Sequence, residues 1–152
     1  MRSNRSMPNA TVIPVLVYED VAEAVEFLAD AFGFVEQLRI GTHRVQLGVG
    51  DGAVVVSERR VAPVHDSTDA VILRAPRRGE ASHSVMVRVE DLDTHYRHAR
   101  QNGARILTPP SDHPYGERQY TAEDLAGHRW TFSQSIADVA PEEWGGQTIS
   151  GR

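Results

Sequence analysis

The chain has 152 residues, 40% of them hydrophobic and 24% charged, a composition typical of one globular domain. Its net charge of −5 argues against general nucleic-acid binding, which requires a cationic face. Cysteine and lysine are both missing from the sequence, which excludes disulfides, thiolate nucleophiles, Cys-ligated metals and lysine Schiff bases. No apolar run reaches the about 20 residues of a membrane span, and Met1–Met7 lacks the apolar stretch of a signal peptide, so we expect a cytoplasmic protein.

The first half of the chain predicts the order β-α-β-β-β. Residues 11–17 are rich in β-branched side chains and predict a strand. Asp20 is a suitable N-cap for a helix that Gly33 ends. The apolar positions of this helix are spaced to line one face, at Val21, Ala24, Val25, Leu28, Ala31 and Phe32. Three predicted strands follow, at residues 35–40, 43–49 and 53–58.

The second half repeats this order. The segment Val15–Val21 is echoed by Met86–Leu92, and the two capping residues, Asp20 and Asp91, are 71 positions apart (91 − 20). Residues 83–89 alternate as a strand does, and a helix after Asp91 ends at Gly103. The remaining predicted strands are residues 104–108, 118–122 and 128–133. The repeat therefore predicts an α+β domain made of two tandem modules.

The predicted boundaries follow from the two copies. A single domain spans residues 10–136, with module one at 10–58 and module two at 83–136. Residues 1–9 are expected to be disordered, and the connection 59–82 to be a functional loop, an arm or a flexible linker. Residues 137–152 form an expected C-terminal arm, in which Trp144 could cap the core, contact a partner subunit or cover a pocket.

Five motifs in this order resemble the vicinal oxygen chelate superfamily of glyoxalase I, bleomycin-resistance proteins and extradiol dioxygenases, most closely its PhnB-like branch. They are Val12–Leu16, Ala31–Phe34, His83–Asp91, Tyr115–Tyr120 and Asp124–Trp130. The resemblance implies two βαβββ modules that form an open, cupped sheet with a ligand in the cup. It also implies a homodimer.

Metal-dependent members of that superfamily hold His or Glu ligands on the first and last strands of each module. Counted along the repeat, the matching positions are Ile13, Val56, Ser84 and Thr131. None of these is a metal ligand, so we expect no cofactor unless a divalent metal uses displaced ligands. The displaced candidates are Glu58, His83 and His128. His83 and His128 share the parity of Val85 and Trp130, and we expect them to be hydrogen-bonded structural residues on the helix-packed side.

Three other histidines are weaker candidates. His95 and His98 stand at i and i+3 on the second helix and are expected to be surface residues. His113 lies in the loop 111–116, which is expected to be a solvated turn.

The same parity predicts the lining of the cup, which mixes apolar side chains with arginines. The predicted ligand-binding residues are Arg44, Gln46, Val56, Glu58, Ser84, Met86, Arg88, Arg118, Tyr120, Arg129 and Thr131. Ile13, Val15, Val17, Val54 and Ser133 are expected on the same face. Arginine forks favour carboxylate or phosphate, so the expected ligand is anionic or aromatic. The alternative is that Arg88, Arg129 and Glu58 are rim charges paired with one another or with a partner subunit.

Two functional hypotheses compete, beside a purely structural dimer scaffold. The first is a glyoxalase/bleomycin-resistance-like protein that binds a small organic molecule without the usual catalytic metal. The alternative is an enzyme of the same superfamily. It would be a metal-dependent lyase or dioxygenase with displaced ligands, or a metal-free isomerase in which Glu58 or Tyr120 transfers a proton. Neither a nucleic acid nor a membrane is an expected partner.

Overall fold

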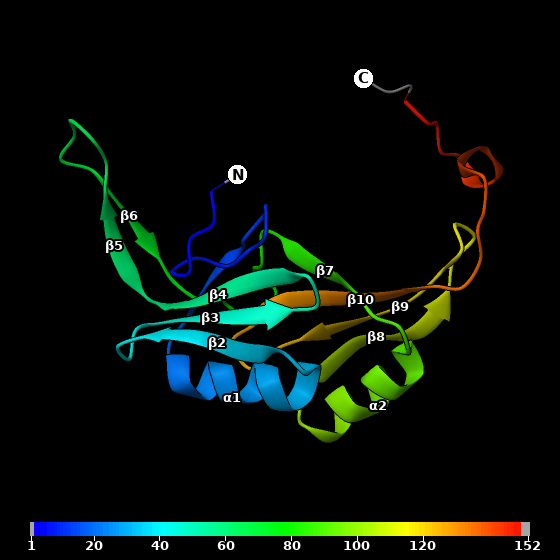
Figure 1. Cartoon of the computed structure of the whole chain (residues 1–152), viewed down its shortest axis with the longest axis horizontal. Coiled ribbons are helices and arrows are strands. Elements are labelled where there is room, and N and C mark those ends of the chain that lie inside the picture. Colours follow the sequence, from blue (N-terminus) through cyan, green and yellow to red (C-terminus); the bar gives the residue numbers. More distant parts are fainter. Residues whose placement is uncertain (1, 150–152) are drawn as a thin grey trace.

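A computed structural model describes residues 2–149 and contains two modules with the same element order (Figure 1). The first module comprises β1 (Val15–Tyr18), α1 (Val21–Phe32), β2 (Val35–Ile40), β3 (Arg44–Val49) and β4 (Gly52–Glu58). The second comprises β7 (Ser84–Arg88), α2 (Leu92–Gln101), β8 (Arg105–Asp112), β9 (Glu117–Glu123) and β10 (Arg129–Ser135). The predicted α+β class and the duplicated β-α-β-β-β order are confirmed.

Each module forms a four-stranded sheet of the same topology. The strand orders are β1-β4-β3-β2 and β7-β10-β9-β8. The first and last strands of each module pair in parallel, and the other neighbours pair antiparallel. The first strands, β1 and β7, are therefore edge strands of their own sheets.

Both helices begin at the predicted caps. The Asp20 carboxylate accepts a hydrogen bond from the Glu23 N–H at 3.0 Å, and the Asp91 carboxylate accepts one from the Thr94 N–H at 3.2 Å. Gly33 ends α1 in the left-handed conformation, with φ at 79°. The echoed Glu-Asp pairs are thus two copies of one local structure.

The two helices lie side by side on one face of the sheets (Figure 1), where both modules share one core. In this core Leu16 and Val45 of the first module lie with Trp130 and Phe132 of the second. We call the opposite face of the two sheets the cup face. None of the helices within residues 2–149 is both long and apolar enough to cross a membrane.

A buried carboxylate joins the two modules through the core. Asp124, 5% exposed, accepts hydrogen bonds from the Tyr18 hydroxyl at 2.6 Å and from the Trp130 indole at 3.0 Å. Its other oxygen accepts from the backbone N–H groups of Ala126 and His128, each at 3.0 Å. Burial and the Asp124 charge raise the pKa of Tyr18 well above its ordinary value. Tyr18 belongs to β1, so these bonds fix one module against the other.

Two histidines of α2 add contacts between the helices. His95 donates from Nε2 to the Phe32 carbonyl at 3.0 Å and accepts at Nδ1 from the Tyr120 hydroxyl at 2.6 Å. Burial lowers the pKa of His95. The expectation of a surface residue is therefore wrong for His95, because α1 packs directly beside it. His98 is exposed, as expected, and donates to the Asp30 carbonyl at 2.7 Å.

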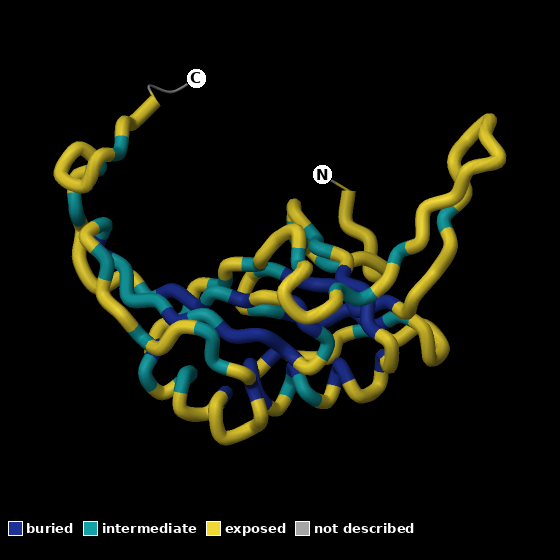
Figure 2. The backbone as a smooth tube through the Cα atoms, turned by 180° about the vertical axis from the view of Figure 1, so that it is seen from behind, coloured by how far each residue is buried: buried dark blue, intermediate teal, exposed yellow. Residues whose placement is uncertain are grey.

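Two segments project on the side away from the helices (Figures 1 and 2). The connection contains a hairpin, β5 (Arg60–Pro63) and β6 (Ala70–Leu73), which the sequence pattern did not predict. The C-terminal arm carries a short 3-10 helix, η1 (Pro141–Trp144), and its Trp144 ring packs on Tyr115 with ring centroids 5.3 Å apart. Tyr115 also stacks on His113, at 5.1 Å and an interplanar angle of 7°. The arm is therefore anchored to the turn between β8 and β9.

Candidate functional site

The cup face of the second module is a connected polar surface. On it, the Ser133 hydroxyl of β10 donates to the Glu117 carboxylate of β9 at 2.7 Å. The Gln119 amide donates to the Ser133 oxygen at 3.0 Å, and the hydroxyls of Thr121 and Thr131 are 3.0 Å apart. These side chains share one face because β9 and β10 pair with Thr121 opposite Thr131 and Gln119 opposite Ser133.

Glu117 is the carboxylate of this polar surface. A hydrogen bond from Ser135, a second from Ser133 and the nearby charge of Arg88 lower the pKa of Glu117 below its ordinary value. The Arg88 guanidinium also donates to the Ser135 hydroxyl. The site therefore holds an ionised carboxylate and a guanidinium linked through one serine.

The cup face of the first module is mainly apolar. The pairing of Val15 with Val55 and of Val17 with Ser57 places these side chains on that face, together with Ala53. Val55 is 1% exposed. Gln46 lies opposite Val55, and its amide donates to the backbone carbonyl of Ser6 at 3.0 Å. The N-terminal segment, predicted to be disordered, thus contacts the cup face through residue 6.

A cavity of about 480 Å³ lies between the modules. One wall is formed by Val12, Pro14 and the turn between β3 and β4, and the other by β7. The β7 wall presents the cup-facing residues Ser84, Met86 and Arg88. The cavity therefore has a mainly apolar first wall that also contains the Asp51 carboxylate, and the Arg88 guanidinium on the second wall. Its volume is within the size range of small-molecule sites.

The prediction of which β4 side chains lie on the cup face is wrong by one residue. Val56 lies opposite Leu16 and Glu58 opposite Tyr18, so both occupy the helix-packed face, and Val54 shares that face. Residues 53–56 are all apolar, because this strand is buried on both sides, and no alternation in the sequence reveals its register. The cup-facing residues of β4 are Ala53, Val55 and Ser57.

The prediction of which β9 side chains lie on the cup face is also wrong. Arg118 lies on the helix-packed side, where its guanidinium meets Asp93 of α2 at 3.1 Å and Asp112 at 2.6 Å. Tyr120 is fully buried and bonded to His95, and burial raises the pKa of Tyr120. The alternation of apolar Tyr120 and Ala122 with polar residues in the sequence does indicate that these two side chains lie on the buried face. The cup-facing residues that were missed are Glu117, Gln119 and Thr121.

The remaining predicted positions lie on the cup face. They are Arg44, Gln46, Ser84, Met86, Arg88, Arg129 and Thr131. Within residues 2–149, Arg88, Arg129 and Glu58 form no ion pair with one another. The alternative that these residues are rim charges paired with one another therefore has no support within the chain.

The corrected register also changes one of the four positions at which the resemblance implies metal ligands. Thr131 pairs with Met86, and the equivalent first-strand residue, Val15 (86 − 71), pairs with Val55. Val55 thus replaces Val56 in a set completed by Ile13, Ser84 and Thr131, which holds no imidazole or carboxylate. In the described part of the chain, no three His, Asp or Glu side chains are grouped to hold a metal ion. These residues do not fit the superfamily's usual metal.

The two histidines considered as ligands of a displaced metal, His83 and His128, differ in their surroundings. His128 is buried and donates to the Val17 carbonyl at 2.7 Å, which confirms the expectation of a hydrogen-bonded structural residue. His83 is exposed, and its ring centroid lies 6.4 Å from that of His128.

The comparisons with known proteins agree with this architecture. The family model for the Glyoxalase/Bleomycin resistance protein/Dioxygenase superfamily matches residues 11–132. The crystal structure of TioX from Micromonospora sp. ML1 is 32% identical, with a TM-score of 0.66, and the match covers 84% of this chain and all of that one. A structure from the same superfamily in Nocardioides is 21% identical, with a TM-score of 0.61, over 92% of this chain and 88% of that one.

A curated relative extends the likeness to mycobacteria. An uncharacterized protein of Mycobacterium tuberculosis (strain ATCC 25618 / H37Rv) is 25% identical over 138 residues, which are 86% of this chain and 77% of the relative. The family match, the duplicated modules and the shared topology together place this chain in the glyoxalase/bleomycin resistance protein/dioxygenase superfamily.

Proposed function

We propose that this protein binds a small organic molecule in the cup between its modules, without the metal ion that other superfamily members use. The main support for this proposal is the cavity of about 480 Å³, which lies between a mainly apolar wall and the Arg88 guanidinium. Such a cavity suits a ligand with an apolar body and a polar end.

The charges at the cup indicate the polar end of the ligand. Arg88 uses one donor on Ser135 and keeps others for a ligand, because a guanidinium has five N–H donors. Arg44 and Arg129 lie on the same face. An anionic group would meet Arg88, which lines the cavity, while an aromatic body would lie against Val12, Pro14 and the other apolar residues of the first wall. A donor group of the ligand could meet Glu117.

The ligand proposal is tested by melting-temperature screening against anionic and aromatic metabolites. We expect compounds that raise the melting temperature of the wild type to lose this effect in Arg88→Ala and Glu117→Gln. Arg118→Ala is the matched control, because Arg118 is next to Glu117 in sequence but lies on the opposite face of β9. Equal loss of the shift in Glu117→Gln and Arg118→Ala would place the ligand elsewhere.

The metal-free part is tested separately. Elemental analysis of protein purified without a histidine tag should find no stoichiometric metal, and added nickel, zinc, manganese or iron(II) should leave the melting temperature unchanged. Near-stoichiometric metal that disappears in His83→Ala would contradict this part of the proposal.

The enzyme alternative needs a proton-transfer residue other than Glu58 and Tyr120. Glu58 lies on the helix-packed face of β4, and Tyr120 is fully buried. Glu117 is the carboxylate of the cup network, but its lowered pKa makes it a weak base, which favours binding over proton abstraction. Turnover of a screened compound that Glu117→Gln abolishes, with binding retained, would favour the enzyme.

We also propose that a second copy of the chain covers the cup face, as a homodimer. The hairpin β5–β6 exposes Val61 by 63%, Val71 by 50% and Ile72 by 53%, and an isolated two-stranded hairpin is marginal in water. On the cup face Met86 is 64% exposed. Analytical ultracentrifugation should show a dimer that Val71→Asp with Ile72→Asp converts to a monomer. An unchanged dimer in this variant would exclude the hairpin from the interface.

A further inference from the structure

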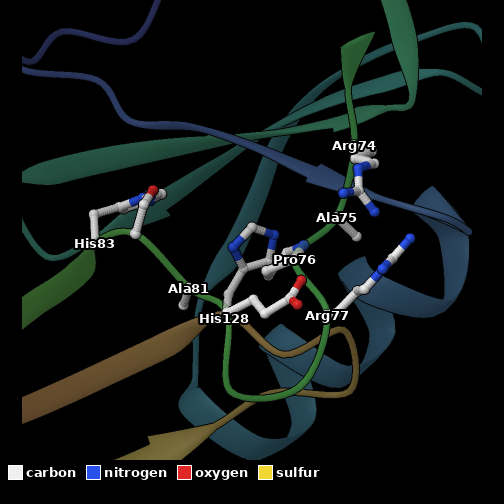
Figure 3. Close-up of a pocket in the computed structure, with 9 residues that line it drawn as sticks. Arg74, Ala75, Pro76, Arg77, Ala81, His83 and His128 are labelled. Carbon is white, nitrogen blue, oxygen red and sulfur yellow. The ribbon is translucent and has the colours of Figure 1, made fainter.

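A second cavity, of about 220 Å³, lies where the connection between the modules meets the start of β10 (Figure 3). Its wall is formed by residues 74–77 and 80–82 of the connection and by His83 and His128 of the second module. In Figure 3 the side chains of Arg74 and Arg77 lie on the same side of the His128 ring. Its polar side chains include Arg74, Arg77, Glu80, His83 and His128.

The connection is held against the second module at this point. Gly127, with φ at 95°, lies so close to Pro76 that an added Cβ would be 3.3 Å from the Pro76 carbonyl oxygen. The Glu80 N–H donates to the Arg77 carbonyl at 3.0 Å, which closes a turn whose Gly79 has φ at 80°. The backbone that carries Arg77 is therefore positioned by packing and by a turn.

The His128 ring is fixed at the inner end of the cavity. His128 is 7% exposed, its Nε2 donates to the Val17 carbonyl at 2.7 Å, and its ring packs on Tyr18 with centroids 4.6 Å apart. Among the described residues, Nδ1 of this ring has no hydrogen-bond partner. Nδ1 is thus the atom that His128 can offer to a molecule in the cavity.

The charges around this cavity are unbalanced. Within residues 2–149, neither Arg74 nor Arg77 forms an ion pair or a side-chain hydrogen bond, although Glu80 lines the same cavity. The next residue, Arg78, differs, since its Nε lies 3.6 Å from the Glu123 carboxylate. Two guanidiniums thus face one carboxylate, in a chain whose net charge is −5. An anion would relieve this local excess of positive charge.

We propose that this cavity binds a small oxyanion of the phosphate or carboxylate class. Arg74 and Arg77 would donate to its oxygens, and Nδ1 of His128 would face the anion at the inner end of the cavity. A volume of about 220 Å³ is below the range of about 300–1,000 Å³ for sites of drug-sized molecules, which fits a small anion. This site does not depend on the proposed function of the cup. His83 lines both cavities, so the anion is either free or the end group of a molecule that reaches into the cup.

The test titrates the full chain with inorganic phosphate by calorimetry, against sodium chloride at matched ionic strength. We expect saturable phosphate binding, weakened about tenfold or more by Arg74→Ala or Arg77→Ala because each removes a charge-assisted contact. Arg78→Ala is the matched control and should bind as the wild type does. Glu80→Gln should bind phosphate more tightly, because it removes the one carboxylate of the lining. Gly127→Ala should weaken binding without removing a charge.

Melting curves without phosphate establish that every variant is folded before titration. Absence of saturable phosphate binding in the wild type would overturn the proposal, and so would equal weakening by Arg77→Ala and Arg78→Ala. A parallel titration with phenyl phosphate separates the two sources of the anion. Equal affinities would assign a free ion, whereas tighter binding of phenyl phosphate that is lost in Met86→Ala would assign an end group that extends into the cup.

Discussion

The two modules have the same topology and both helices begin at an Asp cap, but the cup face of the first module is more apolar than that of the second. The first module presents Val15, Val17 and Val55, whereas the second presents a hydrogen-bonded set that includes Ser133 and Glu117. On the helix-packed side the two copies remain alike, since each buries apolar side chains against its helix. The two modules therefore share the apolar character of the helix-packed face but differ in the side chains of the cup face.

This difference follows from what each face must contact. The inner face packs against a helix at close-packed density, and a polar side chain there costs free energy unless it is bonded. Within residues 2–149 the cup face packs against no helix, and in the second module Gln119, Thr121 and Thr131 are partly exposed there, whereas Val55 of the first module is 1% exposed. Val55 and Thr131 occupy equivalent positions, yet one is an apolar wall and the other a hydroxyl. A ligand in the cup would meet two chemically different walls.

The largest loss of stability is expected at Asp124, where hydrogen bonds connect the two modules. Asp124→Ala removes the acceptor of Tyr18, Trp130 and two backbone N–H groups, all in the core. We expect a loss of about 3 kcal/mol or more in the free energy of unfolding, because several buried donors lose their partner. Urea denaturation measures this loss. Asp138→Ala, at an exposed carboxylate outside the modules, is the control, and equal losses in both variants would show that Asp124 does not join the modules.

The second test makes the apolar cup face resemble the polar one. Val55→Thr places a hydroxyl at a position that is 1% exposed in the first module. We expect a loss of about 1–3 kcal/mol in the free energy of unfolding, because the new hydroxyl is buried without a hydrogen-bond partner. Denaturation of Val55→Thr and Val55→Ala side by side separates this cost from lost packing. A neutral Val55→Thr would mean that the first module tolerates a polar cup face.

Much of the fold could be predicted from sequence because its signals are local. Asp20, Asp91 and Gly33 act through the backbone of their own helix ends, and each has the predicted role. The alternation in β7 also places Val85 and Val87 on the core side and Met86 on the cup face. Local chemistry of this kind is readable without knowing the neighbouring elements.

The candidate site was less predictable because it depends on register and on distant neighbours. Residues 53–56 are apolar on both faces, so counting along the repeat places Val56 where Val55 lies. His95 was expected on the surface because no sequence pattern reveals that α1 packs beside α2. The hairpin β5–β6 has short strands and stands apart from the body, so no core pattern marks it. In each case the missing information is tertiary.

The reverse exchange is expected to have a smaller effect. Thr131→Val makes the second module resemble the first at the equivalent position and removes the contact with the Thr121 hydroxyl. We expect a loss of about 0.5–1 kcal/mol, because Thr121 is only partly buried and water can replace its partner. A double-mutant cycle with Thr121→Val measures the coupling between the two hydroxyls. Zero coupling energy would show that this pair does not stabilise the polar cup face.

The smallest effect is expected for the charge of the polar cup face. Hydrogen bonds from Ser135 and Ser133 lower the pKa of Glu117 in the folded chain below its ordinary value of 4.5. The folded state then binds fewer protons than the unfolded state, so the ionised carboxylate contributes stability above about pH 4.5, which is lost as the pH falls through its lowered pKa. Since solvent screens this partly exposed group, we expect a contribution below about 1 kcal/mol. Urea denaturation at pH 7 and pH 3 should therefore show a smaller pH-dependent change for Glu117→Gln than for the wild type. Glu26→Gln, on the exposed side of α1, should retain the full change, and an equal reduction in both variants would remove Glu117 as the source of acid sensitivity that distinguishes the polar cup face from the apolar one.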